Sequence, residues 1–435
     1  MLAACSDRPL DKLDPPVLRV LRLGAHQLLA TRVGAHAAVA TSVDLAKDVV
    51  GPRGSGYVNA VLRRVSTRDL GAWLAIVAPD PDTDPDGNLA VRYSYPRWIV
   101  SAYREALGDA AHDELESALA AGNDRPRVTM AAFPAGPARD AIMPDGAEPT
   151  RWSPYGFTLP GGDPSSLIAV GQATVQDEAS QLAAIALASV PVDGPDSLWL
   201  DMCAGPGGKS RLLYGLATTA GARLVAADVH PHRAALVKEA LARASRPGPT
   251  PAPPGSTGEE ERFPAAFRRT ADGNLPLRPG ASAIVPGAAV IAADGRRPPW
   301  ADGAFDRVLV DVPCSGLGAL RRRPEARWRK SESDLPTLAA LQRDLLRSAL
   351  AACRPGGVVG YVTCSPVPAE TRDVVTAVIS STAGVQVLDA PAVLSTVPGA
   401  RSASPLFAQL WPHRHGTDAI FIALLRRGTH PSPAG

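Results

Sequence analysis

The chain has 435 residues, of which 45% are hydrophobic and 20% charged, with a net charge of +2 and an isoelectric point near 8.3. This length suits two or three domains with at least one large core, while so small a net charge identifies no partner. No apolar run approaches the roughly 18 residues of a membrane span. The start "MLAACSDRPLDKLD" carries charges where a secretion signal needs its apolar core. Composition therefore excludes membrane and secreted classes, and we expect a cytoplasmic protein.

The chain has five cysteines, and none of them forms a CxxC pair or the cysteine/histidine spacing of a zinc site. We therefore expect free thiols and no bound metal. We also expect a monomer.

The N-terminal part is predicted to be helical. Val17, Leu21, Ala25 and Leu28 recur at i, i+4, i+8 and i+11, which places them on one apolar stripe of a helix. Similar patterns extend this helical set over residues 14–66. The proline- and acid-rich run "APDPDTDPDGN" is typical of a linker. We therefore predict a helical domain over 1–77 and a linker over 78–92.

Residues 93–170 mix helical and strand patterns, with "RVTMAAF" and "GFTLPG" as strands, and predict a small α+β domain. From 171 to 428 the chain alternates helices with apolar strands: "SLWLD", "RLVAAD", "AVIAAD", "DRVLVD", "GVVGYVTC" and "AIFIALLRR". Such runs predict a parallel sheet covered on both faces, an α/β fold of the Rossmann-like kind. The Pro-, Gly- and Ser-rich segment at about 245–280 lacks periodicity and predicts a low-complexity insert.

Several of these strands end in residues suited to a nucleotide-type ligand, and ligands of open α/β sheets bind at that edge. "DMCAGPGGKS" follows the first strand, and its glycines allow a tight turn ahead of a helix N-terminus. The next two strands end at Asp228, suited to ribose hydroxyls, and Asp294, suited to an adenine amino group. Each aspartate alone is also compatible with a helix cap. Together with the loop they predict an adenosine-containing cofactor.

Two further strands end beside cysteines, in "VDVPCS" and "YVTCSP". A nicotinamide-dependent oxidoreductase on the same fold would leave both cysteines unused. Cytosine C5, by contrast, is too weak a nucleophile to attack a methyl sulfonium unaided. A thiolate that adds to C6, with N3 hydrogen-bonded or protonated, turns C5 into an enamine-like carbon that accepts the methyl group. The two cysteines therefore favour a cytosine-5 methyltransferase that uses S-adenosyl-L-methionine.

The motifs "DMCAGPGGKS", "DVPCSGLG", "RRRPEARW" and "YVTCS", in this order, resemble those of the RNA (cytosine-5)-methyltransferases of the NOL1/NOP2/Sun family. The upstream "LRLGAHQLL", "AHAAVATSVDLAK" and "GYVNAVLRRV" resemble the NusB-like domain of its bacterial 16S rRNA members, the RsmB/Sun type. The resemblance implies methylation of a cytosine at C5 in 16S rRNA. It also implies that a NusB-like and a small α+β RNA-binding domain precede the methyltransferase domain.

Three alternatives stay open beside this expectation. The same reaction could act on tRNA or 23S rRNA. The chain could also be a non-catalytic RNA-binding or assembly protein, or the NAD-dependent oxidoreductase that the two cysteines disfavour. The family's NusB-like domain has additional helices before the segment that matches "DRPLDKLDPPVL". We therefore expect this domain to be N-terminally truncated, either because the true start lies upstream or because the domain is reduced.

The resemblance implies roles for single residues. Cys364 is the expected nucleophile, Cys314 is expected to assist release of the covalent product, and Asp311 to contact cytosine N3. Ten residues are expected to bind the cofactor: Cys203, Ala204, Gly205, Pro206, Gly207, Gly208, Lys209, Asp228, Asp294 and Asp311.

The segment "RRRPEARWRK" follows the Asp311 loop and contains six basic residues. A charged run of this kind is often only a solvated face, but its place beside the predicted site favours contact with RNA phosphates, with Trp328 available for stacking. The expected RNA contacts are Arg321, Arg322, Arg323, Arg327, Arg329 and Lys330.

Overall fold

The computed structural model describes residues 1–245 and 282–428, which divide after Val100 into two compact units. The insert expected at about 245–280 lies almost entirely outside the described residues. Each unit has its own core. Among the described residues, no helix combines the length and the apolar character that a membrane span needs.

The first unit is helical, as its apolar stripes predict. Val17 and Leu21 on α2 are buried in one cluster with Val58 and Leu62 on α4. Prolines occupy the first turn of both helices, where a missing N–H costs no hydrogen bond. The elements are α1 (Leu2–Cys5), η1 (Leu10–Lys12), α2 (Pro15–Ala30), α3 (Ala35–Val49), α4 (Pro52–Val65), α5 (Leu70–Val77), α6 (Pro85–Tyr93) and the start of α7 (Arg97–Leu107).

The second half of the predicted linker, 78–92, contains a helix, α6. Pro85 takes the first helical position, and the Asp84 carboxylate accepts a hydrogen bond from the Gly87 N–H at 2.9 Å. Proline and aspartate therefore start a helix here, although the same residues are also typical of loops.

A small antiparallel sheet lies ahead of the large domain, in the strand order β2-β3-β1-β4. Met130 on β1 and Phe157 on β3 are fully buried in its core, in the two segments predicted as strands. The elements of this part are η2 (Gly108–Ala110), α8 (Ala111–Ala121), β1 (Thr129–Ala132), α9 (Arg139–Ile142), β2 (Glu148–Pro149), β3 (Gly156–Thr158), α10 (Ser165–Ala169) and β4 (Ala173–Val175).

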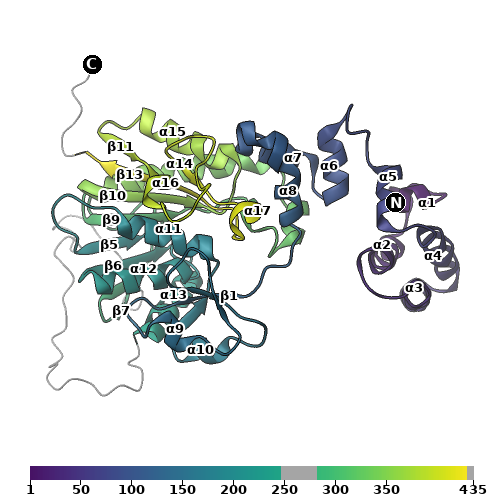
Figure 1. Cartoon of the computed structure of the whole chain (residues 1–435), viewed down its shortest axis with the longest axis horizontal. Helices are drawn as coiled ribbons and strands as arrows, with labels where there is room; N and C mark the ends of the chain where they lie inside the picture. The colour runs from purple at the N-terminus through teal and green to yellow at the C-terminus, as the bar shows by residue number, and fades with distance from the viewer. Residues whose placement is uncertain (246–281, 429–435) are drawn as a thin grey trace. The chain divides into compact units, whose positions relative to one another are not determined.

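The large sheet has the strand order β11-β13-β10-β9-β5-β6-β8-β7, which Figure 1 shows running down the second unit. The five strands from β10 to β8 are parallel, and the strands beyond them are antiparallel. The strands are β5 (Leu198–Asp201), β6 (Arg223–Asp228), β7 (Ser282–Val285), β8 (Ala288–Ala292), β9 (Phe305–Asp311), β10 (Cys353–Thr363), β11 (Val385–Leu388), β12 (Ala408–Gln409), which pairs with β13, and β13 (Phe421–Arg427).

Helices cover both faces of this sheet. Trp199 on β5 packs with α11, α12 and α13, while its neighbours Leu198 and Leu200 pack on the opposite face with α14 and α15. This alternation is the period of two expected of a strand buried on both sides. The helices are α11 (Glu178–Ser189), α12 (Gly208–Thr219), α13 (Pro231–Ala244), η4 (Leu317–Ala319), η5 (Pro324–Trp328), η6 (Glu332–Asp334), α14 (Leu335–Ala352), η7 (Pro368–Glu370), α15 (Arg372–Ser380), α16 (Ala390–Val393) and α17 (Pro412–His415).

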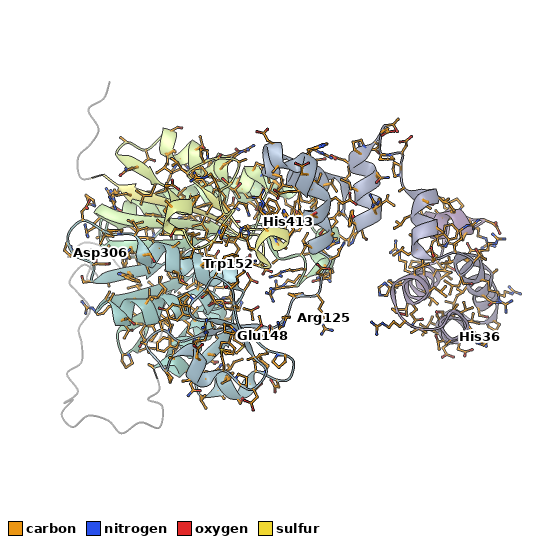
Figure 2. The ribbon with its side chains drawn as sticks, viewed as in Figure 1. His36, Arg125, Glu148, Trp152, Asp306 and His413 are labelled. Carbon is orange, nitrogen blue, oxygen red and sulfur yellow. The ribbon has the colours of Figure 1, made fainter. Side chains whose placement is uncertain are left out.

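The predicted α/β class is therefore confirmed, with two differences. The predicted last strand, β13, runs antiparallel to β10, and the edge strands β7 and β11 were not predicted. The parallel strands all end at one edge of the sheet. Asp306 lies near the beginning of β9, where Figure 2 labels it, and Asp311 lies at the other end.

Candidate active site

Two cysteines lie together where neighbouring parallel strands end. β9 ends at Asp311 and β10 at Thr363, and Asp311 pairs with Val362 in the ladder. The loops that follow therefore start side by side. The Sγ atoms of Cys314 and Cys364 are 3.3 Å apart, close enough for one thiol to donate a hydrogen bond to the other sulfur. Both cysteines are free thiols.

The two sulfurs differ in acidity. The hydrogen bond from Cys314 lowers the pKa of the Cys364 thiol below its usual value, against the opposing effect of burial. The same hydrogen bond, together with burial, raises the pKa of Cys314 well above the usual value. Since the thiolate is the nucleophilic form of cysteine, this arrangement favours ionisation of Cys364 and disfavours ionisation of Cys314.

An ion pair joins the glycine-rich loop to the proline–cysteine loop. The Lys209 ammonium donates to the Asp311 carboxylate at 2.8 Å, and both side chains are largely buried. Burial lowers the pKa of Lys209, but the combined effects of Asp311, Cys364 and Asp201 raise it above its usual value. The positive charge of Lys209 also favours the Cys364 thiolate. The site thus combines a thiol of lowered pKa, a thiol of raised pKa, a carboxylate and an ammonium.

A second carboxyl group, Asp201 at the end of β5, was not predicted as a site residue. Burial raises its pKa to about 7, against a hydrogen bond from the Ser210 hydroxyl at 2.7 Å. Its Oδ1 atom has no hydrogen-bond partner among the described residues. The only signal in the sequence was its position as the last residue of a strand ahead of the glycines.

The glycine-rich loop leaves its backbone open at the start of α12. Gly207 has φ +112°, a conformation that favours glycine, and no side chain caps the helix. A Cβ at Gly205 would lie 2.4 Å from Asp228 Oδ2, so this position also requires glycine. Free N–H groups at a helix N-terminus suit a negatively charged or polar ligand group. The loop therefore fits the carboxylate-bearing part of an adenosine-linked amino acid.

The two predicted adenosine-contacting aspartates lie on neighbouring strands. Asp228 ends β6 and accepts from the Gly205 N–H at 3.0 Å, while Asp294 follows β8 and pairs with Arg296 at 2.7 Å. The Ala293 N–H donates to the Asp228 carbonyl at 3.0 Å, which joins the two strand ends. The structure thus brings the predicted ribose and adenine contacts to the same edge as the loop.

Cys203 lies in the loop but differs from the cysteine pair. Burial and the surrounding carboxylates of Asp201, Asp311 and Asp228 raise its pKa well above the usual value. Its thiol therefore stays neutral, which suits a loop residue beside a ligand and not a nucleophile.

Three of the six basic residues predicted to contact RNA have partners within the fold. Arg321 and Arg322 each bind both Asp177 and Asp418, at 2.6 to 2.9 Å. Arg327 is 3% exposed and donates to the Asn123 side chain at 2.8 Å. These guanidinium groups satisfy buried partners within the fold. Of the other predicted contacts, Arg323 and Arg329 are exposed and Lys330 is half-buried, and Trp328 between them is 63% exposed.

The ion pairs of this segment connect distant parts of the chain. Asp177 precedes α11, and its carboxylate also accepts from the Asp418 N–H at 3.0 Å. Next to it, Glu178 accepts from the Trp152 N–H at 2.6 Å, and the Trp152 indole donates to the His415 carbonyl at 3.2 Å. Figure 2 shows Trp152 close to α17, beside the labelled His413. This network fixes the small sheet to the site edge of the large domain.

Gly318 connects three segments around Cys364. Its N–H donates to the Cys364 carbonyl, and its own carbonyl accepts from the Ala419 N–H, both at 2.9 Å. A Cβ at this position would lie 1.9 Å from the Ala419 oxygen. The position therefore requires glycine for close approach of backbone to backbone.

No group of three or more His, Cys, Asp or Glu side chains suited to a metal ion occurs within 1–245 or 282–428. The site chemistry described above rests on sulfur, carboxylate and ammonium groups.

Comparisons with known proteins identify the relatives of this chain. Residues 186–246 and 284–426 match the family model of the 16S rRNA methyltransferase RsmB/F, and residues 1–67 match the NusB family. A Mycobacterium tuberculosis protein named as a methyltransferase is 44% identical over 435 residues, covering 99% of this chain and 84% of its own length. Ribosomal RNA small subunit methyltransferase B of Pseudomonas putida is 31% identical over 437 residues, covering 98% and 85%.

Solved structures share the fold. The crystal structure of PH0851 has a TM-score of 0.68 at 22% identity, covering 96% of this chain and 84% of that one. The structure of NSun6 from Pyrococcus horikoshii with SFG has a TM-score of 0.59 at 16% identity, covering 78% and 100%. The Rossmann-like fold predicted from the strand pattern is therefore confirmed.

Proposed function

Because the chain belongs to the RsmB/F family of 16S rRNA methyltransferases, we propose that it methylates C5 of a cytosine in 16S rRNA through a covalent cysteine adduct. The observation that carries the proposal is the pair of sulfurs of unequal acidity, Cys314 and Cys364, beside the Lys209–Asp311 ion pair. A methyltransferase acting on a more nucleophilic atom needs neither thiol.

Cys364 is the proposed nucleophile. Its thiolate adds to C6 of the cytosine, and the new S–C6 bond turns C5 into an enamine-like carbon. Asp311 is proposed to contact N3 and the exocyclic amine. Its carboxylate accepts a hydrogen bond from the amine, and from N3 once solvent water has supplied that nitrogen with a proton, which returns to solvent when the base is restored. Lys209 holds the Asp311 carboxylate in place at 2.8 Å.

The cofactor of the reaction is S-adenosyl-L-methionine, which supplies an electrophilic methyl group when bound. We propose that the loop from Cys203 to Lys209 holds its amino-acid part, Asp228 its ribose and Asp294 its adenine. The required glycines at Gly205 and Gly207 and the shared strand edge support this assignment.

Cys314 is proposed to act last. Once C5 carries the methyl group, solvent water takes the C5 proton, the electron pair of that C–H bond forms the C5–C6 double bond, and the S–C6 bond breaks to release the Cys364 thiolate. The Cys314 thiol lies 3.3 Å from the leaving sulfur and can donate a hydrogen bond to it as negative charge returns. This contact assists release of the methylated RNA.

We propose that RNA phosphates are bound by the basic residues of the 321–330 segment whose side chains are not held inside the fold. Trp328, with 63% of its surface exposed, is available to stack on a base. The helical NusB-like unit and the small α+β domain are proposed as further RNA-binding parts. The proposed contacts of the segment are Arg323, Arg329 and Lys330.

The proposal is tested by transfer of labelled methyl from S-adenosyl-L-methionine to unmodified 16S rRNA, with 23S rRNA and tRNA in parallel. We expect label in 5-methylcytosine of 16S rRNA with the wild type and none with Cys364→Ala. Cys353→Ala is the matched control, because it removes a buried sulfur from the other end of the same strand. Methyl transfer only to tRNA or 23S rRNA would show that 16S rRNA is not the substrate. RNA binding without any methyl transfer would indicate a non-catalytic assembly protein.

A further inference from the structure

A buried carboxylate lies behind the two cysteine loops. Glu370 in η7 is fully buried. Its Oε1 atom accepts from the Ser315 N–H at 2.7 Å and from the Gln342 side-chain amide at 3.1 Å. Its Oε2 atom accepts from the Ser365 hydroxyl at 2.6 Å and from the Ser315 hydroxyl. One carboxylate thus receives four hydrogen bonds.

The partners of Glu370 are the residues next to the two sulfurs. Ser315 directly follows Cys314, and Ser365 directly follows Cys364, so the carboxylate connects the two loops one residue beyond each cysteine. The two serine hydroxyls are themselves 3.2 Å apart.

Residues that precede the two cysteines are also connected to Glu370 by hydrogen bonds. Gln342 on α14 donates to the Pro313 carbonyl at 2.9 Å, ahead of Cys314. The Tyr361 hydroxyl on β10 donates to the Glu370 carbonyl at 2.7 Å. Both loops are therefore held to Glu370 from two sides.

A buried carboxylate is costly unless donors satisfy it, so its position is set by the groups that surround it. Nothing in the proposed chemistry uses Glu370, which has no exposed surface for a base or cofactor to touch. We propose that Glu370 is a positioning residue that holds Cys314 and Cys364 at hydrogen-bonding distance. The expected effect of Glu370 on the rate of methyl transfer rests on the proposed function. The positioning of the two cysteines does not.

The negative charge of Glu370 also favours the hydrogen bond between the two cysteines. Besides the hydrogen bond to Cys364 and burial, the negative charge of Glu370 helps to raise the pKa of the Cys314 thiol. A protonated Cys314 is the form that donates to Cys364. The carboxylate thus favours both the distance and the protonation state that the pair requires.

Three variants separate these effects. Glu370→Ala removes the connection between the loops. Glu370→Gln keeps it, because each serine hydroxyl can reverse and accept from the new amide. Glu178→Ala is the matched control: it also truncates a buried glutamate that accepts two hydrogen bonds, from the Trp152 and Ser153 N–H groups, but at another junction.

The first readout needs neither RNA nor cofactor. Diamide takes two electrons and two protons from the Cys314 and Cys364 thiols, which form a disulfide once the sulfurs approach from 3.3 Å to about 2.05 Å. The rate is followed by mass spectrometry of the linked peptides. We expect Glu370→Ala to slow it by about tenfold or more. We expect Glu370→Gln and Glu178→Ala to stay within about threefold of the wild type.

Disulfide formation at the wild-type rate in Glu370→Ala would overturn the proposal. So would equal slowing in Glu178→Ala, since that would mean general loosening, or a Glu370→Gln variant as slow as Glu370→Ala. If Glu370→Ala does not fold, the Ser315→Ala/Ser365→Ala double variant takes its place, because it removes the bridging hydroxyls and keeps the carboxylate.

The second readout is methyl transfer. We expect Glu370→Ala to lower kcat by about 100-fold with the KM for RNA little changed, as for a misplaced reacting group. If Glu370→Ala forms the disulfide slowly but keeps the kcat of the wild type, positioning by Glu370 does not matter for methyl transfer. Failure of the wild type to methylate RNA would contradict the proposed function and leave the disulfide result as a separate test of the positioning.

Discussion

The Lys209 ammonium donates to the Asp311 carboxylate at 2.8 Å, so that the loop proposed to hold the cofactor and the loop proposed to hold the cytosine share one ion pair. Either residue alone would leave a charge in a largely buried place. The pair also contributes to the electrostatics at Cys364, since Lys209 favours its thiolate and Asp311 disfavours it.

Replacing Lys209 by methionine is expected to raise the pKa of Cys364, because the favourable charge is lost and the opposing charge of Asp311 is no longer compensated. Alkylation of Cys364 by iodoacetamide should then require a higher pH, and kcat at neutral pH should fall by about tenfold or more. The measurement is the pH dependence of alkylation without RNA. Lys238→Met, on an exposed position of α13, is the control, and an identical pH profile in Lys209→Met would contradict the prediction.

A variant without Cys314 is expected to accumulate a covalent complex with its RNA. The Cys364–C6 bond still forms, but the leaving thiolate loses the donor 3.3 Å away. Cys314→Ala incubated with rRNA and cofactor should give a protein–RNA band that survives denaturation, and Cys314→Ala/Cys364→Ala should give none. Equal bands in the two variants would show that the adduct does not depend on Cys364.

Replacing a buried arginine of the basic segment is expected to lower stability, whereas replacing an exposed one is expected to weaken RNA binding. Arg321→Ala breaks a buried ion-pair network and should lower the free energy of unfolding by about 3 kcal/mol or more, without changing how RNA affinity depends on salt. Arg329→Ala, at an exposed position, should leave stability almost unchanged and reduce the slope of log K against log[salt] by about 0.7 to 0.9. Both variants are compared with the wild type by urea unfolding and by RNA binding at several salt concentrations. Normal stability together with a reduced salt slope in Arg321→Ala would indicate that Arg321 contacts RNA.

Stability is expected to fall with rising pH because of Asp201. Its pKa is raised from 3.8 to about 7 in the folded protein, so between these values the folded state binds more protons than the unfolded state. The stabilising proton is fully present below the unfolded pKa and is lost as the pH rises through the folded pKa.

Asp201→Asn removes this contribution while keeping an acceptor for the Ser210 hydroxyl. The stability of the variant relative to wild type should therefore increase between pH 5 and pH 8, by on the order of 3 kcal/mol. Urea unfolding at the two pH values measures it. A constant difference between the proteins would show that Asp201 ionises normally in the fold.

The sequence predicted the parallel strands because each is a run of branched apolar residues that ends in a motif. It also predicted that Cys314 and Cys364 share one site, although they are 50 residues apart, because the ends of neighbouring parallel strands meet at one edge. The antiparallel course of β13 could not be predicted, because its apolar run gives no direction.

The internal ion pairs of the basic segment could not be predicted, for a different reason. The charge pattern of "RRRPEARWRK" contains one acidic residue, and the partners of Arg321 and Arg322 lie elsewhere, at Asp177 and Asp418. Local pattern cannot show that a charge is neutralised by residues distant in the chain. The role inferred for Glu370 was missed for the same reason, since its donors come from three separate segments.

Gly318 places a limit on how the gene can change. A methyl group there would meet the Ala419 oxygen at 1.9 Å, and every single-nucleotide change of a glycine codon to a sense codon of another amino acid adds at least that methyl group. A mutation at Gly318 could therefore inactivate the enzyme although both cysteines and the ion pair are kept, and although Gly318 itself has no reactive group. In a deep mutational scan, Gly318 should be as intolerant as Cys364, but for reasons of space alone.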